Sequence, residues 1–197
     1  MAYADKLGMI IGAGEDSLIY RWDIESGKKH KPLADHKYPV SALAVDEKDN
    51  MLISGDSSGK LRLWDLSSGD CLGAWQGHNG KIADLAILSR SWQVISISQS
   101  TPIRIWDIDS GEKLQEIFGS TGWVNALAVS KQENWMLTGG EDGLRLLDLE
   151  NNQCVLSDDS AEVSCLALSM DEKKAISGSR DGSLSMWSNE AFDQENA

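Results

Sequence analysis

The chain has 197 residues, of which 31 are acidic and 18 basic, so its formal net charge is −13. Surfaces that bind nucleic acid need clustered Lys and Arg, and no such cluster occurs, so the charge fits a soluble protein or a protein partner with a basic patch. No apolar run approaches the roughly 20 residues that span a bilayer, and Leu7–Ala13 is too short and lacks the basic leader of a signal peptide.

The chain carries three cysteines, an odd number, without C-x-x-C spacing: Cys71, Cys154 and Cys165. We therefore expect buried free thiols in a reducing, cytoplasmic setting rather than disulfides. Histidines and carboxylates do not recur at metal-ligand spacing, and no Gly-rich phosphate loop leads into a helix. We accordingly expect no metal and no cofactor.

Strand patterns follow one another along the chain in a fixed order. Residues 1–35 predict three strands and lack a counterpart of the first strand of later repeats: Met9–Gly12, Leu18–Ile24 and a segment near Lys29–Leu33. Residues 36–78 predict four strands: Val40–Val45, Met51–Ser54, Lys60–Leu66 and Cys71–Trp75. Residues 79–120 repeat this order: Ile82–Leu88, Gln93–Ser98, Pro102–Ile108 and Lys113–Phe118.

The second half of the chain continues the pattern. Residues 121–160 again predict four strands: Val124–Val129, Met136–Thr138, Leu144–Leu149 and Cys154–Leu156. Residues 161–188 predict only the first three: Val163–Leu168, Lys174–Ser177 and Leu184–Trp187. Residues 189–197 are acidic and predict a tail.

One short phrase closes the third strand of every repeat: Tyr20–Asp23, Arg62–Asp65, Arg104–Asp107, Arg145–Asp148 and Ser185–Ser188. Its Trp, or the Leu that replaces it, recurs at steps of 42, 42, 41 and 40 residues: Trp22, Trp64, Trp106, Leu147 and Trp187. A Trp-Asp pair at this period resembles the WD40 repeat, one blade of a β-propeller.

The resemblance implies an all-β propeller of about 4.5 blades in this chain, with the first strand of each blade nearest the centre. Propellers usually close with about four to eight blades, so we expect a ring that is incomplete or completed by strands of another chain. Two copies of this chain would not complete each other by this count. Their junction would carry six predicted strands, where two blades need eight.

WD40 blades resemble one another in a buried hydrogen-bonded set, which joins a His before the first strand, a Ser or Thr in the second, an Asp in the next turn and the Trp of the third. Each repeat here keeps part of that set: His36, Ser54 and Trp64; His78, Ser96 and Trp106; Asp16 and Trp22; Thr138 and Asp142; Ser177, Asp181 and Trp187. The second and third repeats carry Ser58 and Ser100 where the Asp is expected.

The turns beside the start of each first strand lie on the face that resembles the docking platform of WD40 proteins. Candidate partner-binding residues on this face are Tyr38, Lys81, Trp123, Asn125 and Arg180. Trp123 is the most informative, because an exposed Trp is typical of an anchor at a protein interface. The alternative is that Trp123 packs over the top of its repeat and compensates for Leu147.

These features predict a non-catalytic scaffold or adaptor that binds proteins, as part of an oligomer or hetero-complex. The alternative is a propeller hydrolase or lyase with a site in the central channel. Such an enzyme needs several acids, bases or metal ligands on the first strands, which offer Asp84 and no His. We therefore assign no catalytic residue. A third interpretation is a fragment or a designed partial propeller without a function of its own.

Overall fold

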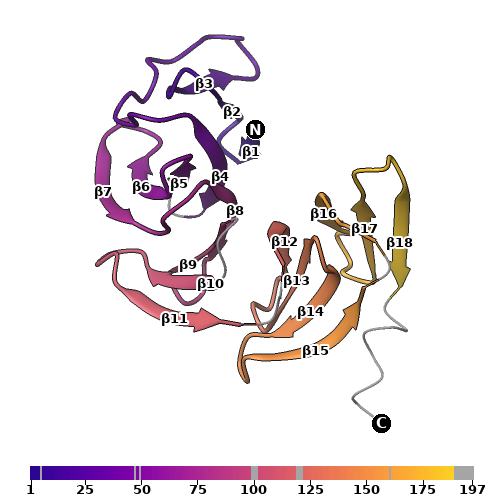
Figure 1. Ribbon diagram of the computed structural model, residues 1–197. Coiled ribbons are helices and arrows are strands. Elements are labelled where there is room, and N and C mark those ends of the chain that lie inside the picture. The colour runs from indigo at the N-terminus through magenta and orange to yellow at the C-terminus, as the bar shows by residue number, and fades with distance from the viewer. Residues whose placement is uncertain are drawn as a thin grey trace. The chain divides into compact units, whose positions relative to one another are not determined.

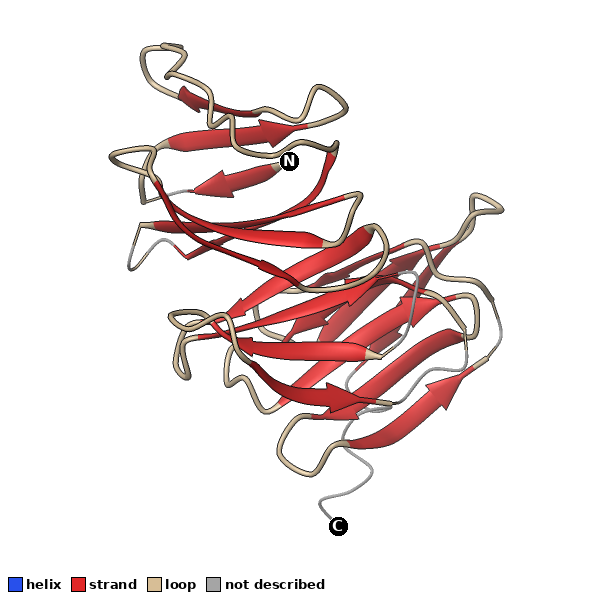
Figure 2. Cartoon of the chain, turned by 60° about the vertical axis from the view of Figure 1, so that its left-hand side comes forward, coloured by secondary structure: helices blue, strands red, loops and turns tan. Residues whose placement is uncertain are grey.

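The computed structural model describes residues 1–4, 6–46, 48, 50–98, 102–118, 122–159 and 161–188 (Figure 1). The regular elements of this part of the chain are all β-strands (Figure 2). It therefore contains no helix that could cross a membrane. The chain divides into two compact units, Met1–Glu116 and Ile117–Ala197. Unit 1 holds the first three repeats, and unit 2 holds the fourth and fifth.

The first repeat forms a sheet of three strands in the order β1-β2-β3: Ala2–Ala4, Met9–Ala13 and Ile19–Asp23. β1 pairs antiparallel with β2, with Ala2 opposite Ile11, and so takes the place of the first strand of later repeats. This corrects the expectation that the first repeat lacks that strand. Three residues are too few to show a readable alternation of apolar and polar side chains. Residues 29 and 33 join β3 by single bridges, where a fourth strand is expected.

The second and third repeats of unit 1 each form a four-stranded antiparallel sheet. The strands of the second are β4 to β7: Val40–Asp46, Met51–Asp56, Lys60–Asp65 and Cys71–Gln76. Those of the third are β8 to β11: Ile82–Leu88, Gln93–Ser98, Ile103–Asp107 and Lys113–Ile117. The first strand of each carries a bulge at its start, between Val40 and Ala42 in β4 and between Ile82 and Asp84 in β8.

In unit 2 the fourth repeat has four strands, β12 to β15: Val124–Val129, Trp135–Gly140, Gly143–Asp148 and Gln153–Asp158. The fifth has three within its described residues, β16 to β18: Cys165–Leu168, Lys174–Gly178 and Leu184–Ser188. The predicted acidic tail, residues 189–197, lies outside the described residues. Cys154 and Cys165 are exposed rather than buried as expected, and Cys71 is half-buried; all three are free thiols.

Side-chain oxygens and glycines fix the turns between strands. After β6, Oδ1 of Asp65 accepts hydrogen bonds from the amides of Ser67 and Ser68 at 2.7 and 2.9 Å. This arrangement explains the Asp that ends the repeated phrase, because a short carboxylate can satisfy the free amides of a tight turn. Gly59, in the turn before β6, has a φ of 85°, and a Cβ there would lie 2.0 Å from the carbonyl oxygen of His78. Only glycine fits this turn.

The apolar core consists of the layers between neighbouring repeats of a unit. Between the first and second repeats, Ile11 and Ile19 pack against Val40, Leu52 and Trp64. The second and third repeats share a cluster that places β5 and β6 against β8 to β10, and it includes these buried members: Ile53, Leu61, Leu63, Ile82, Val94 and Trp106. In unit 2 the equivalent cluster is Leu137, Leu144, Leu146, Val163 and Ala175. Within each unit, the first, second and fourth repeats therefore use the next repeat as the cover for one face of the sheet.

Candidate docking surface

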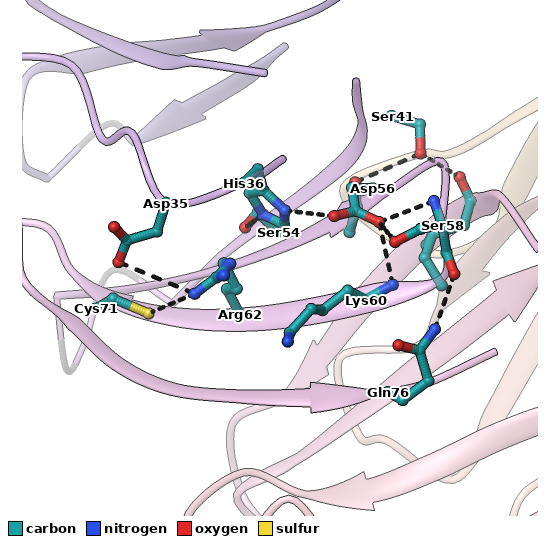
Figure 3. A network of polar contacts seen from close by, with 12 residues as sticks. Asp35, His36, Ser41, Ser54, Asp56, Ser58, Lys60, Arg62, Cys71 and Gln76 are labelled. Atoms are coloured by element: carbon teal, nitrogen blue, oxygen red, sulfur yellow. Dashed lines mark hydrogen bonds and ion pairs between the residues drawn. The ribbon is translucent and has the colours of Figure 1, made fainter. Parts of the chain in front are cut away.

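A buried chain of polar side chains joins the segment before β4 to strands β5 and β6 of the second repeat, and Figure 3 shows its members His36, Ser54 and Asp56. Nε2 of His36, just before β4, lies 2.7 Å from Oγ of Ser54 on β5, and Nε1 of Trp64 on β6 donates to the same Oγ at 2.7 Å. Nδ1 of His36 lies 2.8 Å from Oδ2 of Asp56. A carboxylate only accepts, so Nδ1 carries the proton and Nε2 accepts from the Ser54 hydroxyl. All four side chains are buried and partnered.

Asp56 fills the carboxylate role that the sequence pattern assigned to the position of Ser58. Its Oδ1 accepts from the amide and hydroxyl of Ser58 at 2.9 and 2.6 Å and from the Lys60 amide at 3.1 Å, while Oδ2 faces His36. Burial alone raises the pKa of Asp56, but the hydrogen bonds from Ser58, His36 and Lys60 outweigh it and hold the pKa below its ordinary value. The sequence signal for this role is an Asp two residues after Ser54. It was missed because the usual WD40 spacing places the Asp at position 58.

Burial lowers the pKa of His36, although its hydrogen bond to Asp56 acts in the opposite direction. The ring is therefore neutral in the folded protein near pH 7. Its link to Asp56 is accordingly a hydrogen bond from a neutral imidazole to a carboxylate rather than an ion pair.

The third repeat has the same chain of hydrogen-bonded polar side chains, except that a serine replaces the Asp. Nε2 of His78 lies 2.8 Å from Oγ of Ser96, and Nε1 of Trp106 donates to that oxygen at 2.8 Å. Buried Ser98 stands where the second repeat has Asp56. Burial, with the nearby Arg104 guanidinium adding to it, lowers the pKa of His78 to about 4. The other predicted position, Ser100, lies outside the described residues.

The two repeats of unit 2 keep less of the chain. In the fifth, Nε1 of Trp187 donates to Oγ of Ser177 at 2.9 Å. Asp181 accepts from the Ser183 amide at 2.9 Å and so stabilises its own turn. In the fourth, Thr138 and Leu147 are both buried, and Asp142 pairs with Arg145 at 2.9 Å.

The first repeat has no such chain, because Gly12 offers no hydroxyl to the indole of Trp22. Trp22 instead lies beside Tyr20, with ring centroids 5.7 Å apart. The Tyr20 hydroxyl donates to Asp16 at 2.7 Å, and Nζ of Lys29 lies 3.9 Å from the centre of the Tyr20 ring. Asp16 also accepts from the Leu18 amide at 3.2 Å, so it is a turn residue.

Sequence reasoning missed Arg21, which is buried where the other repeats have an apolar side chain. Its guanidinium donates to the carbonyl oxygens of Leu66 and Lys31, which fastens the first repeat to the second. Burial lowers the pKa of Arg21, while the charge of Asp65 opposes this shift. A cavity of about 300 Å³ next to Arg21 is also lined by Lys31, Asp35 and other residues of unit 1. Its mixed charges do not select one kind of ligand.

Two of the predicted partner-binding residues lie on unit 1. Tyr38 and Lys81 are exposed and stand two residues and one residue before β4 and β8. The carbonyl oxygen of Pro39 accepts from the Ser57 amide at 2.9 Å, so the turn that carries Tyr38 is tied to the turn after β5.

Trp123 stands out on unit 2, because half of its side chain, 51%, is exposed. Its carbonyl oxygen accepts from the Glu141 amide at 2.9 Å, and its own amide lies 3.4 Å from Oε2 of Glu141. The buried place of the missing core Trp is taken by Leu147 itself, which is 1% exposed. The backbone beneath the indole is thus held while the ring projects into solvent.

The other two predicted residues of unit 2, Asn125 and Arg180, have less structural support as partner-binding residues. Nδ2 of half-buried Asn125 donates to the Val163 carbonyl oxygen at 3.1 Å. This bond links the fourth repeat to the fifth, so the amide serves the fold. Arg180 is exposed, and its guanidinium lies 3.9 Å from Glu162. Such a surface pair contributes little stability, so Arg180 keeps its conformational freedom.

A family model described as "WD domain, G-beta repeat" matches residues 27–65, 111–144 and 151–188, more than half of the chain. The chain belongs to the WD40 repeat family. No curated protein sequence matches it. WD40 propellers are typical protein-interaction scaffolds and are generally not enzymes.

Solved structures with the same fold include a chain of "Crystal Structure of Mitotic Checkpoint Complex", 25% identical with a TM-score of 0.82. Another is "Crystal structure of the computationally designed Ika8 protein", 26% identical with a TM-score of 0.77. Each match covers 92% of this WD40 chain, but only 57% and 55% of the length of the two solved chains.

The described residues contain no group of three or more His, Cys, Asp or Glu placed to hold a metal ion. Asp84, the one carboxylate expected on the first strands, has Oδ1 2.9 Å from the Leu85 amide. The structure joins the members of the buried polar chains by hydrogen bonds, whereas the candidate docking residues belong to different repeats: Tyr38 and Lys81 in unit 1, and Trp123, Asn125 and Arg180 in unit 2.

Proposed function

We propose that this protein is a non-catalytic WD40 docking scaffold that binds a basic segment of a protein partner on unit 2. The observation that carries this proposal is the indole of Trp123, half exposed on a turn that is fixed by Glu141. A large, rigid aromatic side chain of this kind is typical of an interface anchor, because it buries much area and loses little conformational entropy.

The charge near Trp123 favours a basic partner. Glu141 is hydrogen-bonded to the Trp123 backbone, and Glu162 occupies the position equivalent to Trp123 in the fifth repeat. Asp159, in the turn between the two repeats, is exposed and reached by Arg145 at 3.2 Å. We call Trp123, Glu141, Asp159 and Glu162 the Trp123 surface. An Arg or Lys of the partner could lie on the indole face and pair with these carboxylates.

The proposal extends to the setting of the protein. Clustered basic residues are absent from the sequence, and the net charge of −13 opposes binding to nucleic acid. The three free thiols fit a reducing cytoplasm. We infer that the chain works as one subunit of a larger assembly, in which Tyr38 and Lys81 of unit 1 offer further contacts.

Peptides selected from a random library on the full chain test this function. We expect the selected peptides to be rich in Arg and Lys, and Trp123→Ala to weaken them about 30-fold, the equivalent of about 2 kcal/mol. Glu141→Gln should weaken them less and reduce the salt dependence of binding. Phe118→Ala, a change at another exposed aromatic residue, should leave binding unchanged. Peptides without basic residues, or equal binding by Trp123→Ala, would contradict the proposal.

A further inference from the structure

In the second and fourth repeats, the same three positions form the sheet face that the following repeat of the unit covers. In the second repeat they are Ile53, Leu61 and Leu63, which are at most 7% exposed. In the fourth they are Leu137, Leu144 and Leu146, at most 6% exposed. Their cover comes from the first, second and third strands of the next repeat within the same unit.

The fifth repeat leaves these positions open. Ile176, Leu184 and Met186 are 49%, 78% and 68% exposed. Ile176 lies directly opposite Met186 across β17 and β18, and Leu184 lies opposite Gly178, so the three side chains share one side of the sheet. On β16 the neighbours in the same rows are Ala167 and Cys165, which are also exposed. We call Ile176, Leu184 and Met186 the fifth-repeat face.

The first repeat has an exposed face made of the positions that, in the second repeat, cover the preceding repeat. Ile10 and Trp22 stand where the second repeat has Leu52 and Trp64, the residues that cover Ile11 and Ile19. Ile10 is 36% exposed, Trp22 is half-buried, and Tyr3 beside Ile10 on β1 is 60% exposed. We call Tyr3, Ile10 and Trp22 the first-repeat face.

We propose that the first-repeat face of one copy packs on the fifth-repeat face of a second copy, head to tail. Two observations favour a second copy: both faces are exposed in the structure, and their residues stand at the register positions that pack on each other inside each unit. Repeat-on-repeat packing already joins the repeats within each unit, so the contact continues an arrangement that the chain uses inside itself.

The strand count supports this contact. The sequence predicted six strands at a junction of two copies, two fewer than two blades require. β1 raises the number to seven: β16 to β18, β1 to β3 and the bridged segment at residues 29–33. Only the outer strand of the fifth repeat is then unsupplied by the described residues.

The contact joins two different faces, so the copies can add to one another without forming a closed ring. Two copies carry ten repeats, more than the usual maximum of about eight blades, so we expect open assemblies that grow with concentration. This inference does not rest on the Trp123 surface, and Trp123→Ala should assemble as the wild type does.

Sedimentation and light scattering over a concentration series test the inference with two end-blocking variants. Leu184→Glu places a charge on the fifth-repeat face, and Ile10→Glu places one on the first-repeat face. Both residues are exposed, so we expect both variants to fold, which their circular dichroism and melting curves would check. Leu72→Glu, at another exposed leucine on β7, is the matched control.

We expect the wild type and Leu72→Glu to exceed the monomer mass of 21.5 kDa increasingly as concentration rises. Each end-blocked variant alone should remain a monomer. Their equimolar mixture should form a dimer and stop there, because the one open face of each variant pairs with that of the other and both remaining faces are blocked. A wild type that is monomeric throughout, an Ile10→Glu variant that pairs with itself, or a mixture that stays monomeric would overturn the inference.

Discussion

The second and fourth repeats form the same kind of sheet but differ in the side chains buried at equivalent positions. The second buries a chain of four polar side chains, from Asp56 through His36 and Ser54 to Trp64. The fourth keeps Thr138, fills the Trp position with buried Leu147 and directs Asp142 to Arg145 instead. Both nevertheless form four-stranded sheets with equivalent apolar faces.

We infer from this difference that the members of the polar chain depend on one another. A buried polar group without a partner costs about 1–3 kcal/mol, whereas the loss of both partners together can be nearly neutral. The fourth repeat has lost both the His and the Trp, and its sheet persists. In the second repeat every member has its partner, so the removal of one member should be costly.

The largest expected loss of stability follows the replacement of Trp64 by the Leu that the fourth repeat carries at the equivalent position. Trp64→Leu removes the donor to Ser54 and leaves a cavity in the fully buried site, so we expect a loss of about 3 kcal/mol in the free energy of unfolding. Urea denaturation followed by circular dichroism measures it. Trp22→Leu is the control, because Trp22 is half-buried with no hydroxyl opposite its indole, and it should cost clearly less.

The next largest effect should follow removal of the carboxylate. Asp56→Ala leaves Nδ1 of His36 and the turn amides of Ser58 and Lys60 without their acceptor, so we expect about 2–3 kcal/mol of destabilisation. Ser58→Ala, at the position where the repeat pattern places the Asp, should cost about 1 kcal/mol or less. Equal losses in the two denaturation curves would show that Asp56 does not hold the chain together.

A shift in pH should separate the His-containing repeats from the others. The folded pKa of His78, about 4, lies below that of an unfolded His, so the unfolded chain takes up the proton first as pH falls. Stability should therefore drop by about 2 kcal/mol between pH 7 and pH 5. His36, whose pKa is also lowered, acts in the same direction. His78→Asn should flatten the curve of melting temperature against pH; an unchanged slope would contradict the assignment.

The smallest effect is expected in the fourth repeat. Asp142→Asn weakens a partly buried pair with Arg145, which also reaches Asp159, so the loss should stay below about 1 kcal/mol. Melting temperatures of Asp142→Asn and Asp56→Asn compare the two repeats directly. A larger loss for Asp142→Asn would reverse the order proposed for them.

The repeat period and the strand patterns were enough to predict the fold class, because each blade restates the same alternation and the same turn residues. They could not show β1, whose three residues carry little pattern, or the burial of Arg21, which depends on carbonyl groups far away in the sequence. The role of Asp56 was not predicted, because it depends on the reach of its side chain to His36 and not on its spacing in the repeat. The docking roles of Tyr38, Lys81, Trp123, Asn125 and Arg180 remain predictions, since a repeat pattern predicts the fold that carries a surface and not the partner that binds to it.

A double-mutant cycle between His36→Ala and Asp56→Ala tests most directly whether the polar chain acts as a set. If it does, the double variant should lose about 1–3 kcal/mol less stability than the two single losses added together, because each single change strands the other partner. If the losses simply add, to within about 0.5 kcal/mol, the two side chains act independently and the contrast with the fourth repeat has another cause.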